Sequence, residues 1–497
     1  MSRKEKHVVV IGAGPGGLSA AMILANRGYR VSIYEREDRV GGRNRTFELG
    51  PYSFDLGPTF LMMDFFLREI FLLAGRKIED YLSLVRLDPM YELNFDKDRL
   101  LLTDDHYTMK ARLAQMFPGD EEGLDKFLEK EKIKYEKMYP CLRKDYSTLS
   151  SMFHKDLLTA LPYLDLPKNI FSKLGDYFTD ERCRLGFTFQ AKYLGMSPWE
   201  CPAAFTILPY IEHEYGIYHV MGGLGKISTA MAQVIEEHDG QIHLGRKVNR
   251  VMVNDRRQAR GVELDDGEKV EADAVVINAD FGHAMETLFA PGVIRKYSPD
   301  KLRRKKYSCS TFMIYLGVNR LYDEEHHQII FADDYKRNID DIMSGRPLHE
   351  DMSIYVRNAS RTDASLAPEN HSALYILVPV PNSMSGIVWD AEQTASYRSQ
   401  VMERITERTS MRDLQDHIVV ERIITPADWK NEYHLFEGAT FNLGHNIGQM
   451  LYFRPHNRFE EVGNCYLVGG GTHPGSGLPT IYESGRITAN LIFNDLV

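Results

Sequence analysis

The 497-residue sequence predicts an α/β protein, because two glycine-rich stretches near its ends each join a short apolar strand to a helix. The first, HVVVIGAGPGGLSAAMILANRGYRVSIYE at residues 7–35, reads as strand, glycine turn, helix and second strand. The second, CYLVGGGTHPGSGLP at residues 465–479, reads as strand and glycine loop before a terminal helix. Strand–helix–strand units of this kind build parallel sheets. The two ends of the chain are therefore expected to form one discontinuous domain.

The first stretch has the spacing of a dinucleotide-binding turn. The glycines of Gly12-Ala13-Gly14-Pro15-Gly16-Gly17 let the chain turn tightly and approach a pyrophosphate without a Cβ in the way. The helix at about residues 16–27 then offers its free N–H groups and the positive end of its dipole to the phosphates. The second strand ends at Glu35, beside Arg36, where a carboxylate accepts hydrogen bonds from ribose hydroxyls and repels a 2′-phosphate.

A second glycine turn follows at Arg39-Val40-Gly41-Gly42-Arg43. Gly42 delivers the Arg43 guanidinium, which suits bidentate phosphate contact, toward the same pyrophosphate. Together with GxGxxG and Glu35, this turn resembles the flavin-dependent amine oxidase and carotenoid desaturase superfamily, in which the three features mark FAD. The resemblance implies a tightly held FAD in a Rossmann-like domain of the amine-oxidase (GR2) type. It also implies a mixed-sheet substrate domain interleaved with that domain, and a helical, possibly membrane-associating insertion.

Composition narrows the class of protein further. A formal net charge of −10 and an isoelectric point near 6.0 argue against nucleic-acid binding, which needs a basic excess. Five widely spaced cysteines show neither a disulfide framework nor metal-ligand spacing, so we expect no metal site and a reducing cytoplasm.

The pattern along the chain predicts three units. Residues 119–144 carry dense alternating charges at helical spacing and are expected to form a solvated helix. The stretch after them is rich in Leu, Phe and Tyr, which suits the wall of a substrate cavity. The expected units are an FAD-binding domain of residues 1–95, 220–300 and 455–497, a substrate-binding domain of residues 96–144 and 301–454, and a helical insertion of residues 145–219.

No apolar run reaches the roughly 18 residues that a spanning helix needs, so only attachment to a membrane surface stays open. Two segments are candidates, residues 60–74 and residues 157–174, the second with Lys155, Lys168 and Lys173 beside it. For the first we favour a buried core helix. For the second, a core position and a membrane-facing position are equally open.

Two strings indicate the branch within the superfamily, Asp55-Leu-Gly-Pro-Thr59 and Gly471-Thr-His-Pro-Gly-Ser-Gly-Leu-Pro479. Both resemble bacterial carotenoid desaturases, and the resemblance over nearly the whole chain is closest to the diapophytoene desaturases of C30 carotenes. Gly470 and Gly471 stand where typical FAD oxidases carry an acidic residue, so backbone N–H groups are expected to replace its contacts. The resemblance also implies FAD contacts from Gly57, Pro58, Thr59, Val248, Gly477, Leu478 and Pro479.

The chemistry implied by the resemblance is hydride transfer from a C–C bond to the flavin, followed by loss of a proton from the allylic cation. A long apolar carotene offers nothing to hydrogen-bond, so it must be recognised by shape and buried apolar area in a tunnel, with the insertion as its wall. His473 is the first candidate for accepting the proton, ahead of Glu212, His213 and Glu214. A structural role for His473, or proton transfer to the flavin or to water, is equally open.

The leading hypothesis is an FAD-dependent desaturase of 4,4′-diapophytoene. Alternatives on the same fold are a C40 phytoene desaturase and an oxidase of the terminal methyl groups of a C30 carotenoid. An amine oxidase and a flavin-binding protein without turnover are less favoured. Without a second nucleotide fingerprint, oxygen or a quinone is the expected electron acceptor rather than NAD(P)H. A lipid-dissolved substrate predicts a cytoplasmic protein attached peripherally to the cell membrane.

Overall fold

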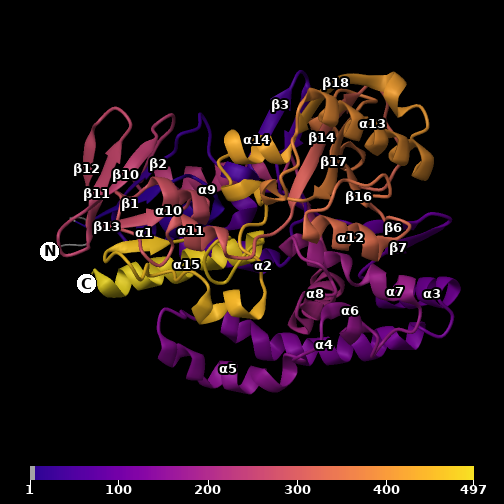
Figure 1. Cartoon of the computed structure of the whole chain (residues 1–497), viewed down its shortest axis with the longest axis horizontal. Helices are drawn as coiled ribbons and strands as arrows, with labels where there is room; N and C mark the ends of the chain where they lie inside the picture. Colours follow the sequence, from indigo (N-terminus) through magenta and orange to yellow (C-terminus); the bar gives the residue numbers. More distant parts are fainter. Residues whose placement is uncertain (1–5, 497) are drawn as a thin grey trace.

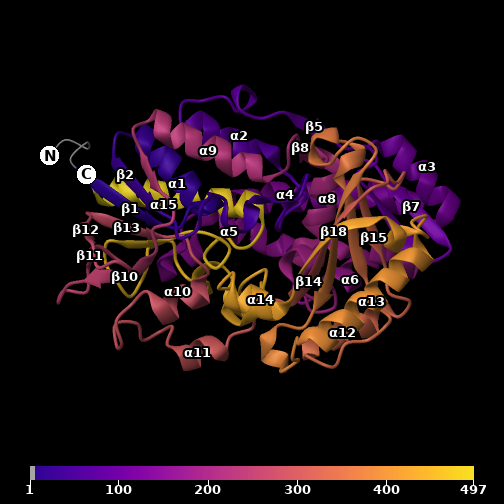
Figure 2. The same ribbon diagram turned by 90° about the horizontal axis from the view of Figure 1, so that it is seen from above.

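The computed structural model, which describes residues 6–496, contains two large sheets and a layer of helices. Figure 1 shows the five-stranded sheet near both chain ends, the seven-stranded sheet at the other end, and helices α3 to α8 along one side. Figure 2, seen from above, shows α1, α9 and α15 gathered around the first strands.

The five-stranded sheet is parallel throughout, in the order β19-β13-β1-β2-β9. Its strands are β1 His7–Ile11, β2 Arg30–Tyr34, β9 Gln241–His243, β13 Ala274–Ile277 and β19 Cys465–Leu467. The central strands β1 and β13 are buried along their whole length, which is why they read as continuous apolar runs. The two ends of the chain thus share one sheet, as predicted.

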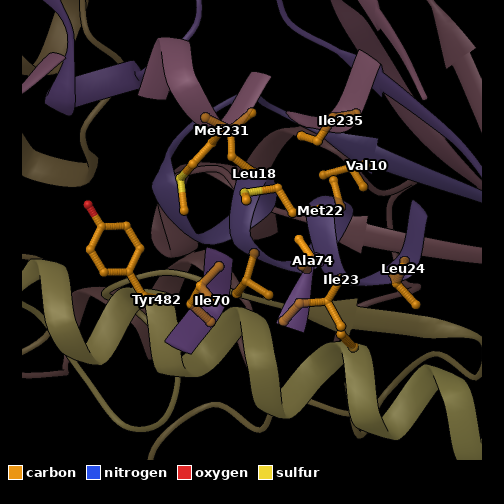
Figure 3. Close-up of a cluster of buried hydrophobic side chains, with 14 of the residues drawn as sticks. Val10, Leu18, Met22, Ile23, Leu24, Ile70, Ala74, Met231, Ile235 and Tyr482 are labelled. Carbon is orange, nitrogen blue, oxygen red and sulfur yellow. The ribbon is translucent and has the colours of Figure 1, made fainter. Parts of the chain in front are cut away.

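Four helices pack around this sheet, and Figure 3 shows the apolar core among them. They are α1 Pro15–Asn26, α2 Asp64–Leu73, α9 Gly225–Glu237 and α15 Leu478–Asp495. Helices α1 and α15 approach closely at Gly485, where a Cβ would lie 2.7 Å from the Gly16 carbonyl oxygen. The core position predicted for residues 60–74 is confirmed, because α2 buries Phe66, Ile70 and Phe71.

Three smaller sheets and two short helices complete this part of the fold. A three-stranded sheet is formed by β10 Val248–Val253, β11 Ala259–Leu264 and β12 Lys269–Glu271. An Asp-Gly hairpin lies between β11 and β12, with Gly267 at φ +88°. Two-stranded ribbons pair β3 Thr46–Leu49 with β4 Tyr52–Asp55, and β5 Leu84–Arg86 with β8 Tyr218–Val220. Helices α10 Phe281–Thr287 and α11 Pro299–Arg303 follow β13.

The seven-stranded sheet is mixed, in the order β18-β14-β17-β16-β15-β6-β7, with β15 and β6 parallel. Its strands are β6 Tyr91–Phe95, β7 Asp98–Leu102, β14 Ser310–Val318, β15 His327–Ile330, β16 Ile354–Asn358, β17 Ser372–Val380 and β18 Ile418–Ile424. Helices α12 Tyr335–Ser344, α13 Ala391–Arg408 and α14 Pro426–Asn431 accompany it. Because β6 pairs with β7, the expected boundary at residue 95 cuts through a hairpin and belongs before β6. The division into three domains otherwise stays a prediction.

The helical layer consists of α3 to α8. These are α3 His106–Met116, α4 Glu121–Leu142, α5 Lys155–Ala160, α6 Ile170–Leu174, α7 Glu181–Gly186 and α8 Ile207–Tyr215. The expectation that α4 is simply solvated is wrong on one face, where Glu131 and Lys134 are buried. Their ion pair at 2.9 Å is completed by Thr206, which hydrogen-bonds both side chains. Buried charges are tolerated where partners of this kind satisfy them.

Residues 157–174 form no single helix but two short ones, α5 and α6, joined by turns. One face is core, with Leu157, Ile170 and Leu174 buried. The other exposes Leu158, Leu161 and Leu166. Lys168 and Lys173, which a membrane-facing position would place at lipid headgroups, form ion pairs with aspartates. No helix among residues 6–496 is long and apolar enough to cross a bilayer.

Candidate functional site

The glycine turn after β1 lies against Asn278, the first residue after the neighbouring strand β13. The Asn278 amide donates a hydrogen bond of 3.1 Å to the Gly12 carbonyl. A Cβ on Gly14 would lie 2.8 Å from that amide, and a Cβ on Gly17 would lie 2.7 Å from the Gly12 carbonyl oxygen. Gly12 itself has φ +91°, which favours glycine. The glycines are therefore required by packing as well as by approach to a ligand.

Glu35 directly follows β2 beside this turn, with its carboxylate buried. One oxygen accepts the Ala13 amide at 2.7 Å and the other accepts the Glu37 amide at 3.0 Å. These bonds orient the carboxylate and leave each oxygen a second lone pair for a ribose hydroxyl. The neighbouring Arg36 forms an ion pair with Glu37 at 3.2 Å, so it lies at the edge of the site.

The second glycine turn is a short 3-10 helix, Gly42–Asn44, entered at Gly41 with φ +113° and Gly42 with φ +55°. The Arg43 guanidinium donates to the Thr440 carbonyl at 2.7 Å. Among residues 6–496 no carboxylate forms an ion pair with it, and burial lowers the Arg43 pKa. A partly buried cation in this position is suited to an anionic ligand.

The C-terminal glycine loop meets the start of α1. The Gly469 nitrogen lies 3.0 Å from where a Cβ on Gly16 would stand, and it donates to the Ser484 hydroxyl at 2.9 Å. After Gly470 and Gly471 the loop reaches Gly477, whose φ of +110° starts α15 at Leu478 and Pro479. Both ends of the chain thus present helix N-termini and small residues to one region, as the resemblance implied.

The Asp55–Thr59 string is held by three tyrosines and one arginine. Asp55 forms a fully buried ion pair with Arg357 at 2.8 Å. Tyr375 donates to the Gly57 carbonyl at 2.8 Å, and the Thr59 hydroxyl hydrogen-bonds Tyr355 at 2.8 Å. Pro58 lies between these two anchors. The string is therefore a rigid bridge between β4 and the seven-stranded sheet.

These features fit FAD. The α1 N-terminus and Arg43 would hold the diphosphate, Glu35 the adenosine ribose, and the Gly57–Thr59 and Gly477–Pro479 segments the flavin. Val248 begins β10 and pairs with Leu264, and its contact with adenine stays a prediction. The sequence reasoning missed Asn278 as part of the cradle. Its place directly after a strand parallel to β1 was the available signal.

His473 lies on the side of the C-terminal loop that faces the helical layer. Its ring packs edge-on against Tyr146 at 4.9 Å, and its side chain is buried. Burial, together with the nearby Arg454 charge, lowers the His473 pKa to about 3. A ring of such low basicity is a weak proton acceptor at neutral pH. Its catalytic role stays a prediction.

The other predicted proton acceptors lie apart from His473, on α8. Glu212 accepts hydrogen bonds from Tyr91 at 2.8 Å and Gln190 at 2.7 Å. His213 contacts the Thr103 carbonyl at 3.1 Å, and burial lowers its pKa to about 4. Glu214 is exposed. The surroundings of Glu212 and His213 are those of structural residues on a packed helix.

Lys192 is a further candidate that the sequence reasoning did not single out. Its ammonium group lies over the Tyr335 ring, 4.9 Å from the centroid, in the interior between the helical layer and the seven-stranded sheet. Burial lowers the Lys192 pKa to about 7, and the nearby Cys309 acts in the opposite direction. No described side chain forms an ion pair or hydrogen bond with the ammonium group. A single lysine beside aromatic residues gives no local sequence signal of a site, because the residues around its side chain come from distant segments.

Comparison with known proteins identifies the class. The family described as flavin containing amine oxidoreductase matches residues 15–493. A solved putrescine oxidase structure with putrescine bound superposes with a TM-score of 0.66 at 16% identity, covering 98% of this chain and 99% of that one. The chain therefore belongs to the flavin-containing amine oxidoreductases and is an FAD-dependent oxidoreductase.

Relatives of higher identity narrow the assignment to one group. A 4,4′-diapophytoene desaturase (4,4′-diapolycopene-forming) of Methylomonas sp is 52% identical over 487 residues, which cover 98% of this chain and 95% of that protein. A zeta-carotene-forming phytoene desaturase of Myxococcus xanthus is 38% identical over 490 residues, covering 98% and 93%. The chain is thus a member of the carotenoid desaturase family, as the resemblance indicated.

Proposed function

We propose that the protein desaturates 4,4′-diapophytoene, a C30 carotene. The observation that carries the proposal is the 52% identity, along nearly all of both chains, to a desaturase of that name. The C40 phytoene desaturase of Myxococcus xanthus is more distant, at 38%. Bound FAD would supply the acceptor for the hydride that leaves the carotene.

The side chains next to the Asp55–Thr59 string suit an apolar substrate. Phe60 stacks on His327 with centroids 4.1 Å apart, and Tyr91 packs edge-on to Phe189 at 4.9 Å. Burial and the nearby Arg357 charge lower the His327 pKa well below its usual value, so this ring stays neutral. An uncharged aromatic wall would recognise a hydrocarbon by shape and buried area.

Co-expression with a C30 diapophytoene synthase in a colourless host tests the proposal. The expected result is a yellow to red pigment that is two hydrogens lighter per step than diapophytoene. Unchanged diapophytoene overturns the proposal. Conversion of phytoene alone would then establish the C40 alternative, and oxidation of supplied diapolycopene would establish the methyl oxidase. Repeating the assay without oxygen, with and without an added quinone, identifies which of these two proposed electron acceptors is used.

For the proton acceptor, Lys192 competes with His473. A neutral lysine accepts a proton, and with a pKa of about 7 the neutral fraction of Lys192 rises as the pH rises through that value. We expect the rate constant of the chemical step to fall roughly tenfold per pH unit below about 7, and Lys192→Met to abolish this dependence. Single-turnover flavin bleaching measures it. An unchanged pH profile in Lys192→Met, with loss of turnover in His473→Ala, would favour His473 instead.

We further propose that the protein attaches to a membrane surface through an apolar patch on the helical layer. The α5 patch comprises the exposed side chains of Leu149, Phe153, Leu158, Leu161, Leu166 and Phe453. Phe153 is 71% exposed, and the short 3-10 helices Leu149–Phe153 and Leu451–Phe453 lie in contact. Figure 1 shows α5 along the lower edge of the molecule, on the side of the helical layer away from the seven-stranded sheet. Clustered exposed apolar residues of this kind mark interaction sites.

Liposome flotation tests the patch. Wild-type protein is expected to float with phospholipid vesicles, whereas Phe153→Asp/Leu158→Asp is expected to bind at least about tenfold more weakly, since each inserted side chain contributes about 1.5–3 kcal/mol. Leu321→Asp/Val419→Asp, which alters two exposed residues of the sheet domain, is the matched control and should float. Equal flotation of the two double variants, or no flotation of wild type, would remove the proposal.

A further inference from the structure

Arg454 is the largest fully buried side chain among residues 6–496. It follows the short 3-10 helix Leu451–Phe453 and lies behind the C-terminal glycine loop. Its guanidinium donates only to backbone carbonyls, those of Leu443, Gly444, Gln449, Gly470 and Thr472. The side chain therefore joins the segment at 443–449 to the loop at 470–472.

No carboxylate in the described chain forms an ion pair with Arg454, which distinguishes it from the other buried arginines. Arg357 is paired with Asp55, and Arg408 with Asp96. Desolvation alone lowers the Arg454 pKa to about 9, so the group is still mainly charged at neutral pH. The ionisable groups that feel this charge are His445, His473 and Lys305, none of which is an anion. A buried charge without a counter-charge is costly, and a nearby anion offsets that cost.

The geometry connects this charge to the cofactor site through one peptide group. Arg454 donates to the Gly470 carbonyl at 2.6 Å. In a trans peptide the N–H of Gly471 points opposite to that carbonyl, away from the guanidinium. A cation bound to the carbonyl polarises the peptide and strengthens its N–H as a donor. The preceding residue, Gly469, already lies against Gly16 at the start of α1.

We infer that Arg454 is a positioning residue for FAD, which shapes the Gly470–Gly471 loop and provides the interior positive charge that balances the cofactor's diphosphate. This role suits a chain that has two glycines where an acidic residue is typical, because backbone N–H groups must then make the contacts. It depends on FAD binding and not on the identity of the carotene.

Titration of the apo-protein with FAD, followed by flavin fluorescence, tests the inference. Arg454→Met is expected to bind FAD at least tenfold more weakly than wild type. Arg454→Lys, which keeps the charge but loses the planar fork, is expected to recover part of the affinity. Arg257→Met is the matched control, because Arg257 also donates only to carbonyls, of Val293 and Glu461, but lies on the surface.

A second measurement separates cofactor binding from general stability. Melting temperatures are compared for apo and FAD-loaded protein, and the stabilisation by FAD is expected to shrink in Arg454→Met and partly return in Arg454→Lys. Wild-type FAD affinity in Arg454→Met overturns the inference. Equal losses of FAD affinity in the lysine and methionine variants also overturn it, because they would show that only the shape of the side chain matters. Failure of both variants to fold overturns it as well. None of these readouts requires a carotene, so they are independent of the proposed substrate.

Discussion

Replacing Arg357 with methionine is expected to lower the free energy of unfolding by about 3–5 kcal/mol, because it leaves the Asp55 carboxylate buried without its cation. The two side chains are each 3% exposed and 2.8 Å apart. Arg357 also contacts His219 at 3.1 Å and His326 at 3.3 Å. The Asp55 carboxylate in turn accepts the Gly225 amide at 3.2 Å. One arginine therefore supports β4, β16 and the start of α9 together.

Chemical denaturation of the apo-protein measures this loss. Arg337→Met is the matched control, because Arg337 is largely exposed and its contact with Asp341 is long, at 3.7 Å. The double variant Asp55→Asn/Arg357→Met should lose less stability than the sum of the losses in the two single variants, since neither uncompensated charge remains. Because Asp55 anchors the string that ends at Thr59, FAD affinity should fall with stability. A destabilisation by Arg357→Met no larger than that of the control would contradict the role of this pair.

Gly17→Val is expected to weaken FAD binding by roughly 100-fold or more, equivalent to about 2.7 kcal/mol. Even a Cβ at this position would lie 2.7 Å from the Gly12 carbonyl oxygen and 2.9 Å from the Asn278 Cβ. Neither neighbour can yield without moving β1 or β13, so α1 must shift and carry its N-terminal amides away from the diphosphate.

Flavin content after purification and FAD titration of the apo-protein measure the effect. Gly448→Val is the matched control, because Gly448 is exposed and a Cβ there would lie 3.9 Å from its nearest neighbour. The circular dichroism spectrum of Gly17→Val should show that the seven-stranded sheet and helical layer persist. Normal flavin content in Gly17→Val would mean that the glycine turn does not hold the cofactor.

The sequence alone was sufficient for the parts of the protein that local chemistry dictates. The parallel strands β1 and β13 are recognisable as short apolar runs, and the glycine turns follow from backbone geometry within a few residues. Short motifs at residues 12–17, 39–43, 55–59 and 471–479 also indicated FAD and the carotenoid desaturase family. In each case the signal lies within one continuous stretch of chain.

Tertiary structure decided what depends on residues far apart in sequence. Asp55 and Arg357 are separated by 302 positions, and Asn278 is separated by 266 positions from the Gly12 carbonyl that it contacts. The buried ion pair of α4 cannot be recognised among its many charged residues, because only packing against α8 and its neighbours shows which face of the helix is interior. Whether a charge is satisfied, exposed or left without a counter-charge is a property of its surroundings in space, and for Lys192 and Arg454 those surroundings are assembled by the fold.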